Sequence, residues 1–333
     1  MAGRRQVGAS NLHDDLIVFD GLNVSNWSRA VFEDMRRGGV TAANCTCSVW
    51  EGFRDTMRNI ALWKDWFRDH ADLLTQVYGV ADIARAKREG KTGIVLGFQN
   101  VSAFEDQIGY VQLFKELGVG IAQLAYNTQN QVGSGCYESR DSGLSDFGRE
   151  IVAEMNRVGM LCDLSHVGAT TSRDTILAST KPVCYSHCLP SGLKAHPRNK
   201  SDEELRFIAE RGGFIGVTMF PPFLAKGVDS TVDDYIAAID YIINLAGEES
   251  VGIGTDFTQG YGKEFFEWIT HDKGNARKLT EFGEILNPQG MRAIGDFPNL
   301  TVAMERAGWS EPKIRKVMGD NWVRLLAEVW GPD

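Results

Sequence analysis

The sequence predicts an α/β fold, a single (β/α)8 barrel of the TIM type with extra helices at its C-terminus. Short apolar runs alternate with longer amphipathic stretches along the 333 residues, which is the pattern of repeated β-α units. Eight such runs can be counted, the number of strands in a closed parallel barrel. Glycine accounts for 36 residues, which fits a fold with many tight strand-to-helix turns.

The predicted strands are apolar runs bounded by turn residues, and they span 16–23, 41–48, 93–100, 121–127, 160–166, 182–188, 214–220 and 250–257. A helix is predicted over 146–159, where apolar residues recur every three to four positions and Gly159 is the stop signal. A second is predicted over 201–213, opened by the capping box of Ser201 and Glu204. Further helices are predicted over 231–247, 297–307 and 311–330.

We expect one barrel domain over residues 1–333, because no Pro- or Ser-rich linker, internal repeat or low-complexity run divides the chain. The main interruption is the segment 259–295, which follows the eighth strand and is long, aromatic and mixed in charge. Long insertions after a barrel strand usually shape the mouth of the active site. We therefore expect residues 259–295 to lie over that mouth.

Charge and cysteine content restrict the partners and the compartment. The chain has 35 Lys and Arg against 44 Asp and Glu, a net charge of −9, which argues against nucleic acid and anionic membranes as partners and favours small molecules. No secretory signal and no apolar stretch of 18 residues is present. The six cysteines match no zinc or redox template, so we interpret them as reduced core residues of a cytoplasmic protein.

Polar residues that end barrel strands converge on one face, so they are the candidates for chemistry. They are Asp20 and Asn23, Gln99 and Asn100, Tyr126 and Asn127, Asp163, Ser165 and His166, Ser186 and His187, and Thr255 and Asp256. His166 and His187 end adjacent strands and can offer two imidazoles to one divalent cation. Asp256 can ligate a metal or move a proton, or else form a structural hydrogen bond.

Five stretches resemble the membrane (renal) dipeptidase family in order and spacing. They read GLSDFGREIVAEMNRVGMLCDLSHVGATTSRDTI, KPVCYSHC, HPRNKSDEELRFIAERGGFIGV, VGIGTDF and MGDNWVRLL. The resemblance covers nearly the whole chain. It implies a β/α barrel, two zinc ions bridged by a glutamate and a hydroxide, hydrolysis of dipeptides and related amides, and a homodimer.

The resemblance also implies roles for four residues. His166 and His187 match the ligands of one zinc ion, and Arg198 matches the arginine that holds the substrate carboxylate, a task suited to a bidentate guanidinium. Asp256 matches the aspartate that takes a proton from the attacking water and passes it to the leaving amine.

Four positions depart from the family pattern. The first strand of the family ends in D-G-H-N-D, whereas Leu22 and Val24 stand here in place of its histidine and second aspartate, both ligands of the other zinc. Gln99 replaces the bridging glutamate, and Tyr126 replaces a histidine that polarises the substrate carbonyl. Two Zn²⁺ ions would be poorly neutralised by the groups that remain. We therefore expect at most one metal ion, or none.

The main hypothesis is a metal-dependent hydrolase of a dipeptide or a small carboxylate-bearing amide. One divalent metal, zinc by resemblance, is held by His166 and His187, with Gln99 as a weak ligand, Asp256 as a further candidate ligand, and water. Asp256 is the general base and then acid, Tyr126 donates a hydrogen bond to the developing oxyanion, and Arg198, Tyr126 and Asn127 bind the substrate.

Two alternatives stay open. The first is a different enzyme on the same barrel, in which Tyr126 and the aromatic insertion with Phe265, Phe266 and Trp268 surround a quaternary amine; the same aromatics can instead pack a lid or a dimer. The second is a catalytically silent ligand-binding or structural protein.

Overall fold

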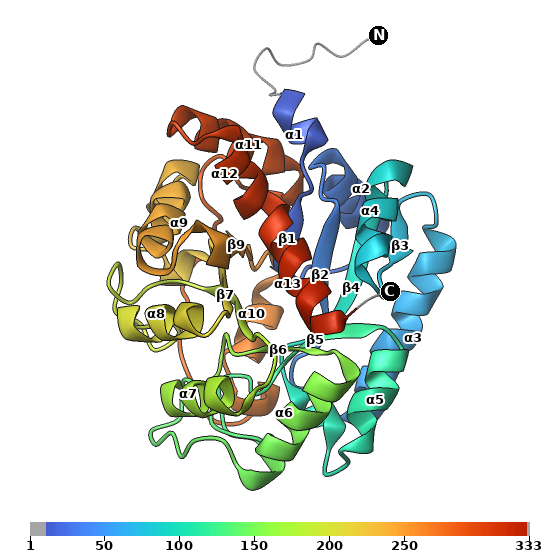
Figure 1. Ribbon diagram of the computed structural model, residues 1–333, viewed down its shortest axis with the longest axis vertical. Helices are drawn as coiled ribbons and strands as arrows, with labels where there is room; N and C mark the ends of the chain where they lie inside the picture. The colour runs from blue at the N-terminus through green and yellow to red at the C-terminus, as the bar shows by residue number, and fades with distance from the viewer. Residues whose placement is uncertain (1–10, 332–333) are drawn as a thin grey trace.

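A computed structural model describes residues 11–331 and contains a parallel barrel surrounded by helices (Figure 1). In these residues the barrel strands, in spatial order, are β1 (Phe19–Asn23), β2 (Ala42–Ser48), β4 (Thr92–Phe98), β5 (Val119–Gln123), β6 (Leu161–Asp163), β7 (Cys184–Cys188), β8 (Phe214–Val217) and β9 (Val251–Ile253). Six lie inside the predicted runs, whereas β4 begins one residue and β5 two residues before theirs. The predicted fold class is confirmed.

The barrel is closed between its first and last strands just beyond their carboxyl ends. Asn23 forms a parallel bridge with Phe257, and the Val24 amide donates to the Phe257 carbonyl at 2.9 Å. The Asp256 amide donates to the Leu22 carbonyl at 3.0 Å. The closure therefore brings the ends of β1 and β9 together at the edge where the polar residues collect.

One strand was not predicted from the sequence. Strand β3 (Leu74–Gln76) pairs with β4 outside the barrel path. It is three residues long and only Leu74 is buried, so it has no apolar run for a sequence pattern to detect. The barrel strands are also shorter than the predicted runs. In β4, β5, β6, β8 and β9 the last residues of the run leave the ladder, and several of them form the site.

The α-helices of the described chain are α1 (Asn11–Asp15), α2 (Arg29–Arg37), α3 (Phe53–Asp69), α4 (Val80–Glu89), α5 (Gly109–Glu116), α6 (Asp146–Val158), α7 (Ala169–Ala178), α8 (Asp202–Glu210), α9 (Val232–Ala246), α10 (Lys263–Ile269), α11 (Phe297–Arg306), α12 (Glu311–Arg315) and α13 (Asn321–Trp330). Short 3₁₀ turns span Val101–Phe104, Pro221–Phe223, Gly227–Asp229, Glu248–Ser250, Asp272–Gly274 and Ile294–Asp296. No helix in residues 11–331 has the length and apolar character needed to cross a bilayer.

The predicted helix ends are confirmed where a side chain defines them. Ser201 and Glu204 form the expected capping box of α8, and Thr231 caps α9. Gly159 ends α6 in the left-handed conformation, with φ 71°.

The predicted helix over 311–330 is confirmed in its extent, although it is not α-helical throughout. A π-helical segment at Lys316–Asp320 separates α12 from α13. Trp322 of α13 then packs against Phe19 and Phe214 of the barrel strands, and its indole N–H donates to the Ile253 carbonyl at 2.8 Å. Gly21 is required at this point, because an added Cβ would lie 2.3 Å from the Trp322 ring.

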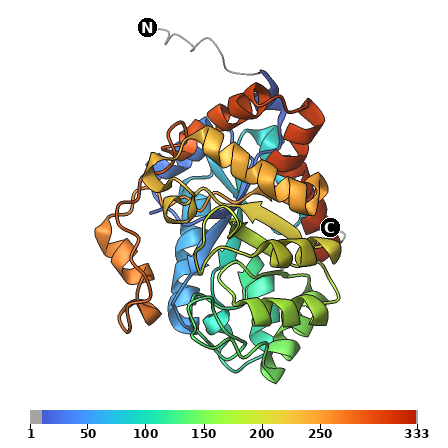
Figure 2. The ribbon, with the colours of Figure 1, turned by 90° about the vertical axis from the view of Figure 1, so that its left-hand side faces the viewer.

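The insertion 259–295 contains α10 and otherwise irregular chain. Figure 2 shows α10 and the segment after it, in orange, standing out from the barrel. Three of its side chains, Phe265, Ile269 and Phe282, line a cavity at the carboxyl ends of the strands. These three side chains place part of the insertion at the barrel mouth.

Candidate active site

The candidate residues lie where the sequence placed them, at the carboxyl ends of the barrel strands. Each is at most 8% exposed: Gln99 after β4, Tyr126 and Asn127 after β5, His166 after β6, His187 in β7, and Asp256 after β9. Four of these residues, Gln99, Tyr126, His166 and Asp256, line one common cavity. The parallel barrel therefore brings together residues that are up to 157 positions apart in the sequence.

The imidazole rings of His166 and His187 face each other at the wall of this cavity. Their Nε2 atoms are 3.0 Å apart. On the opposite side of each ring, Nδ1 has a fixed partner: His166 Nδ1 lies 2.7 Å from Asn127 Oδ1, and His187 Nδ1 lies 2.7 Å from the Ser186 hydroxyl. Tyr126 stacks on His166 with ring centroids 4.1 Å apart. Both imidazoles are thus held in orientation as well as in position.

The chemistry of these partners favours one pair of tautomers. An amide oxygen only accepts, so His166 Nδ1 carries the proton. The Ser186 hydroxyl gives its single proton to Asp163 Oδ2 at 2.6 Å, so it must accept from His187 Nδ1. Each neutral ring then presents the lone pair of Nε2, and the two lone pairs point at each other.

Asp163 stabilises this arrangement of the two histidines through hydrogen bonds. Its carboxylate accepts four hydrogen bonds, from the amides and hydroxyls of Ser165 and Ser186, at 2.6 to 3.0 Å. The Ser165 hydroxyl in turn accepts from the His187 amide at 3.0 Å. The sequence pattern identified these three residues only as strand-end candidates, without this role. An Asp-Ser-His chain of hydrogen bonds links β6 to β7 and positions the imidazole.

Both imidazoles of the pair are in their neutral form. Burial, and next the Arg198 charge, hold the pKa of both imidazoles well below their usual range, so the rings are neutral near pH 7. Two neutral nitrogen lone pairs at 3.0 Å repel unless a cation lies between them. Two imidazoles on one tetrahedral zinc at about 2.0–2.1 Å place their nitrogens roughly 3.3 Å apart. The donor set therefore fits one metal ion.

The donor set does not extend to a second ion. In residues 11–331 no group of three or more His, Cys, Asp or Glu side chains is placed to hold a metal. Asp256 therefore does not complete a three-residue metal group with the two histidines. At the end of β1, Leu22 and Val24 are buried apolar residues, and Asp20 accepts from the Thr255 amide and hydroxyl at 2.8 and 2.7 Å.

Gln99 and Asp256 differ in how they are held. Gln99 Oε1 accepts from the Thr46 hydroxyl at 3.1 Å. Asp256 lies in the left-handed region at φ 62°, and Asn127 does so at φ 60°. Such strained residues cluster at functional sites. Burial raises the pKa of Asp256 to about 7, although the Arg198 charge lowers it.

Arg198 lies behind the histidines and does not line the cavity. Its guanidinium donates to the Ser165 carbonyl and, at 2.9 Å, to the His187 carbonyl, while Nε has no hydrogen-bond partner in the described part of the chain. The Phe223 ring, 5.6 Å from the guanidinium carbon, does line the cavity. In this conformation Arg198 ties β6 to β7 and adds positive charge beneath the site.

The cavity over the histidines is small, about 20 Å³. That is about the space of one water molecule, whereas ligand pockets usually measure some 300–1,000 Å³. Six of the lining residues are apolar: Val24, Phe220, Phe223, Phe265, Ile269 and Phe282. Three of these, Phe265, Ile269 and Phe282, come from the insertion, and in this conformation the cavity is too small for a dipeptide.

Comparison with known sequences places the chain in a family. The profile of the membrane dipeptidase family, peptidase family M19, matches residues 17–282. Dipeptidase tcpJ of Claviceps purpurea is 29% identical over 279 residues, which are 83% of this chain and 60% of that relative. The chain spans about three fifths of the length of the curated relatives it matches.

Comparison with solved structures agrees on the fold. The crystal structure of an amidohydrolase from Pseudomonas aeruginosa is 65% identical, with a TM-score of 0.96 over 98% of this chain and 100% of that one. A metallo peptidase from Rhodobacter sphaeroides, solved with a phosphinate mimic of the dipeptide L-Ala-D-Ala, is 19% identical, with a TM-score of 0.79 over 95% of this chain and 99% of that one. The second likeness concerns the fold alone.

Proposed function

Because the chain belongs to the membrane dipeptidase family, we propose that it is a metal-dependent hydrolase of dipeptides or small carboxylate-bearing amides that uses at most one metal ion. One observation carries the proposal: His166 and His187 aim two Nε2 lone pairs at one point, 3.0 Å apart, and both rings are locked by their Nδ1 hydrogen bonds. A ring pair packed only for stability would not need both lone pairs on the same side.

In this proposal His166 and His187 hold the ion, zinc by family precedent, and Gln99 is a weak additional ligand beside water. A divalent cation supplies Lewis acidity there, which acidifies water and polarises a carbonyl group. We propose one metal ion and not two because a second ion would lack ligands and negative charge. Leu22 and Val24 contribute no ligand, and Gln99 contributes no charge.

The proton is moved by Asp256. Its pKa of about 7 lets it accept a proton from the attacking water and later give that proton to the leaving amine. Tyr126 donates a hydrogen bond to the developing oxyanion, because burial raises the pKa of its hydroxyl and keeps the proton on it. Asn127 fixes His166 and contributes to the substrate site, and Arg198 attracts a substrate carboxylate once the apolar cover has moved.

Metal reconstitution of the purified, chelator-treated protein tests the proposal. We expect uptake of about one equivalent of Zn²⁺, Mn²⁺ or Co²⁺ and the appearance of hydrolysis on a dipeptide panel, because the two imidazoles alone supply strong ligands. Metal content is measured by elemental analysis, and product amines by chromatography.

Two outcomes would contradict the proposal. Uptake of two equivalents would contradict the single-ion site. Less than about 0.2 equivalents, with no hydrolysis under any metal, would favour the silent ligand-binding protein instead.

The substitution Asp256→Asn tests the proton carrier. Asn also tolerates the left-handed backbone, so the change isolates the charge. The folded carboxyl keeps its proton up to about pH 7, whereas the unfolded one loses it near pH 4, so wild-type stability falls between these values as pH rises. In metal-free protein the variant should be about 1–4 kcal/mol more stable than wild type at pH 8 and closely similar at pH 4.

Chemical denaturation at the two pH values measures this difference. The metal-loaded variant should also lose about 100-fold or more in kcat. Asp233→Asn is the control, because Asp233 is exposed and pairs with Arg306 at the surface. A variant with wild-type kcat, or with a stability gain that is the same at pH 4 and pH 8, would disprove the role of Asp256.

We also propose a cytoplasmic location. All six cysteines are free, and five of them are buried in the core. Cys136 is the partly buried exception. The homodimer implied by the family resemblance stays a prediction.

A further inference from the structure

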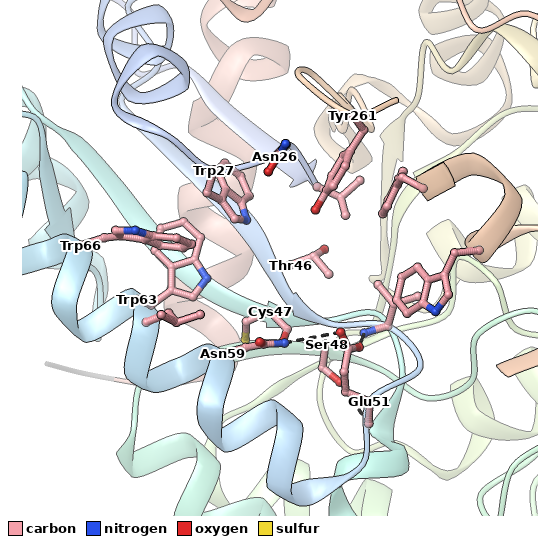
Figure 3. Close-up of a pocket in the computed structure, with 15 residues that line it drawn as sticks. Asn26, Trp27, Thr46, Cys47, Ser48, Glu51, Asn59, Trp63, Trp66 and Tyr261 are labelled. Carbon is pink, nitrogen blue, oxygen red and sulfur yellow. Dashed lines mark hydrogen bonds between the residues drawn. The ribbon is translucent and has the colours of Figure 1, made fainter. Parts of the chain in front are cut away.

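A second, larger cavity lies beside the one over the histidines (Figure 3). Its volume is about 270 Å³. It is bounded by the chain after β1, the end of β2, one face of α3 and the start of the insertion. The two cavities share Val24 and Phe265, and Thr46, which lines the larger one, donates to Gln99 in the smaller. Whatever occupies the larger cavity therefore lies next to the candidate active site.

Aromatic rings form its walls on two opposite sides. Trp27, Trp63 and Trp66 come from the barrel side, and Trp63 contacts each of the other two with ring centroids 4.9 Å apart. Tyr261 and Phe265 of the insertion face them, stacked at 3.7 Å with their planes 8° apart. In Figure 3 the three tryptophans lie on one side of the cavity and Tyr261 on the other, with Thr46 between them. Tryptophan and tyrosine faces carry the negative potential that attracts cations.

Glu51 is the one charged residue among those that line this cavity. Its carboxylate accepts from the Val49 amide at 2.7 Å and from the Asn59 amide group at 3.4 Å. In residues 11–331 it forms no ion pair with a Lys, Arg or His side chain. It directly precedes the N-terminus of α3, where the helix dipole favours a negative charge. The cavity thus holds a fixed carboxylate without a counterion.

The other polar side chains of the wall are engaged with the protein itself. Asn59 also donates to the Cys47 carbonyl at 3.0 Å, and Asn26 donates to the Gly260 carbonyl at 3.1 Å. The Ser48 hydroxyl accepts from Thr56 at 3.1 Å. A ligand with many hydrogen-bond donors would find few directional partners here. A ligand that carries its positive charge on an apolar surface needs no hydrogen-bond partners.

We propose that this cavity binds an alkylated ammonium group, such as trimethylammonium, against the rings of Trp27, Trp66 and Tyr261 with Glu51 as its counterion. Neutral apolar groups would fit the rings but leave Glu51 without a counterion, and a primary ammonium would lose hydrogen bonds to water that the wall does not replace. The inference concerns binding alone and does not rest on hydrolysis or on a metal.

Calorimetric titration of the metal-free protein with choline and with 3,3-dimethylbutan-1-ol tests it, because the two probes share a shape and differ in charge. We expect choline to bind at least about tenfold more tightly than its neutral isostere. Glu51→Gln and Tyr261→Leu should each weaken choline binding by about fivefold or more. Glu105→Gln, which lies in a separate groove, should leave the Kd of choline unchanged.

Each other outcome overturns the proposal. Equal affinity for the two probes would show that the cavity binds apolar groups regardless of their charge. Absence of choline binding would show that the cavity does not bind an alkylated ammonium group. Choline binding that neither variant weakens would place the ligand elsewhere. Circular dichroism of both variants verifies their folding, and since the titration needs no turnover, a failed hydrolysis assay would not affect its result.

Discussion

Replacement of either histidine of the facing pair, as His166→Ala or His187→Ala, should abolish metal uptake and reduce hydrolysis by about 1,000-fold or more, to background. Each substitution removes one of the two proposed nitrogen ligands, and the described chain offers no third His, Cys, Asp or Glu side chain to complete a group in its place. In wild type, added Zn²⁺ should raise the melting temperature, because the ion binds only the folded state. In the variants it should not.

His271→Ala is the matched control. His271 lies in the insertion, where its Nδ1 contacts the Glu267 carbonyl at 2.6 Å, and it takes no part in the pair. This variant should keep wild-type metal content and activity. Metal content near one equivalent in His166→Ala or His187→Ala would refute the site, and so would a zinc-induced rise in melting temperature equal to that of wild type.

The substitution Asp163→Asn should combine a large loss of stability with a large loss of metal affinity. Asp163 accepts four buried hydrogen bonds from Ser165 and Ser186, and an amide group offers one acceptor oxygen and turns two donors toward those donors. We expect the free energy of unfolding to fall by about 2–4 kcal/mol. Because the same network orients His187, metal affinity should fall about 10- to 100-fold.

Two further variants separate the two effects. Asp141→Asn is the control, since Asp141 also accepts four hydrogen bonds, from Gly143, Thr170 and Thr171, but none of these residues contacts the histidine pair. It should lower stability and leave metal affinity unchanged. Ser186→Ala removes the link to His187 Nδ1 and should weaken metal binding with a smaller loss of stability. Wild-type metal affinity in both Asp163→Asn and Ser186→Ala would exclude a positioning role.

Local sequence patterns were sufficient for the barrel and for the neighbourhood of the site. Periodicity located the eight barrel strands, because each buried strand is an apolar run with its own turn signals. The histidines follow from the same pattern, since each ends a run and the runs are neighbours. Strand β3 and the π-helical break before α13 escaped it, because neither depends on a local periodicity; β3 exists through its pairing with β4.

The contacts within the site were not accessible to such patterns. Nothing local in the sequence indicates that Asp163 reaches His187 through Ser186, that Arg198 turns to carbonyl groups behind the site, or that Trp27 and Tyr261 face one cavity. These facts depend on strand register and on the path of the insertion, which long-range packing sets.

The sequence by itself determined the barrel and the positions of His166, His187 and Asp256 at or near strand ends, because residue type and periodicity are local properties. The tertiary structure alone decided the 3.0 Å separation of the imidazoles, the tautomers that aim both lone pairs at one point, and the closing of the site under the insertion. Those properties arise between segments far apart in the chain, and barrel closure brings these segments into contact.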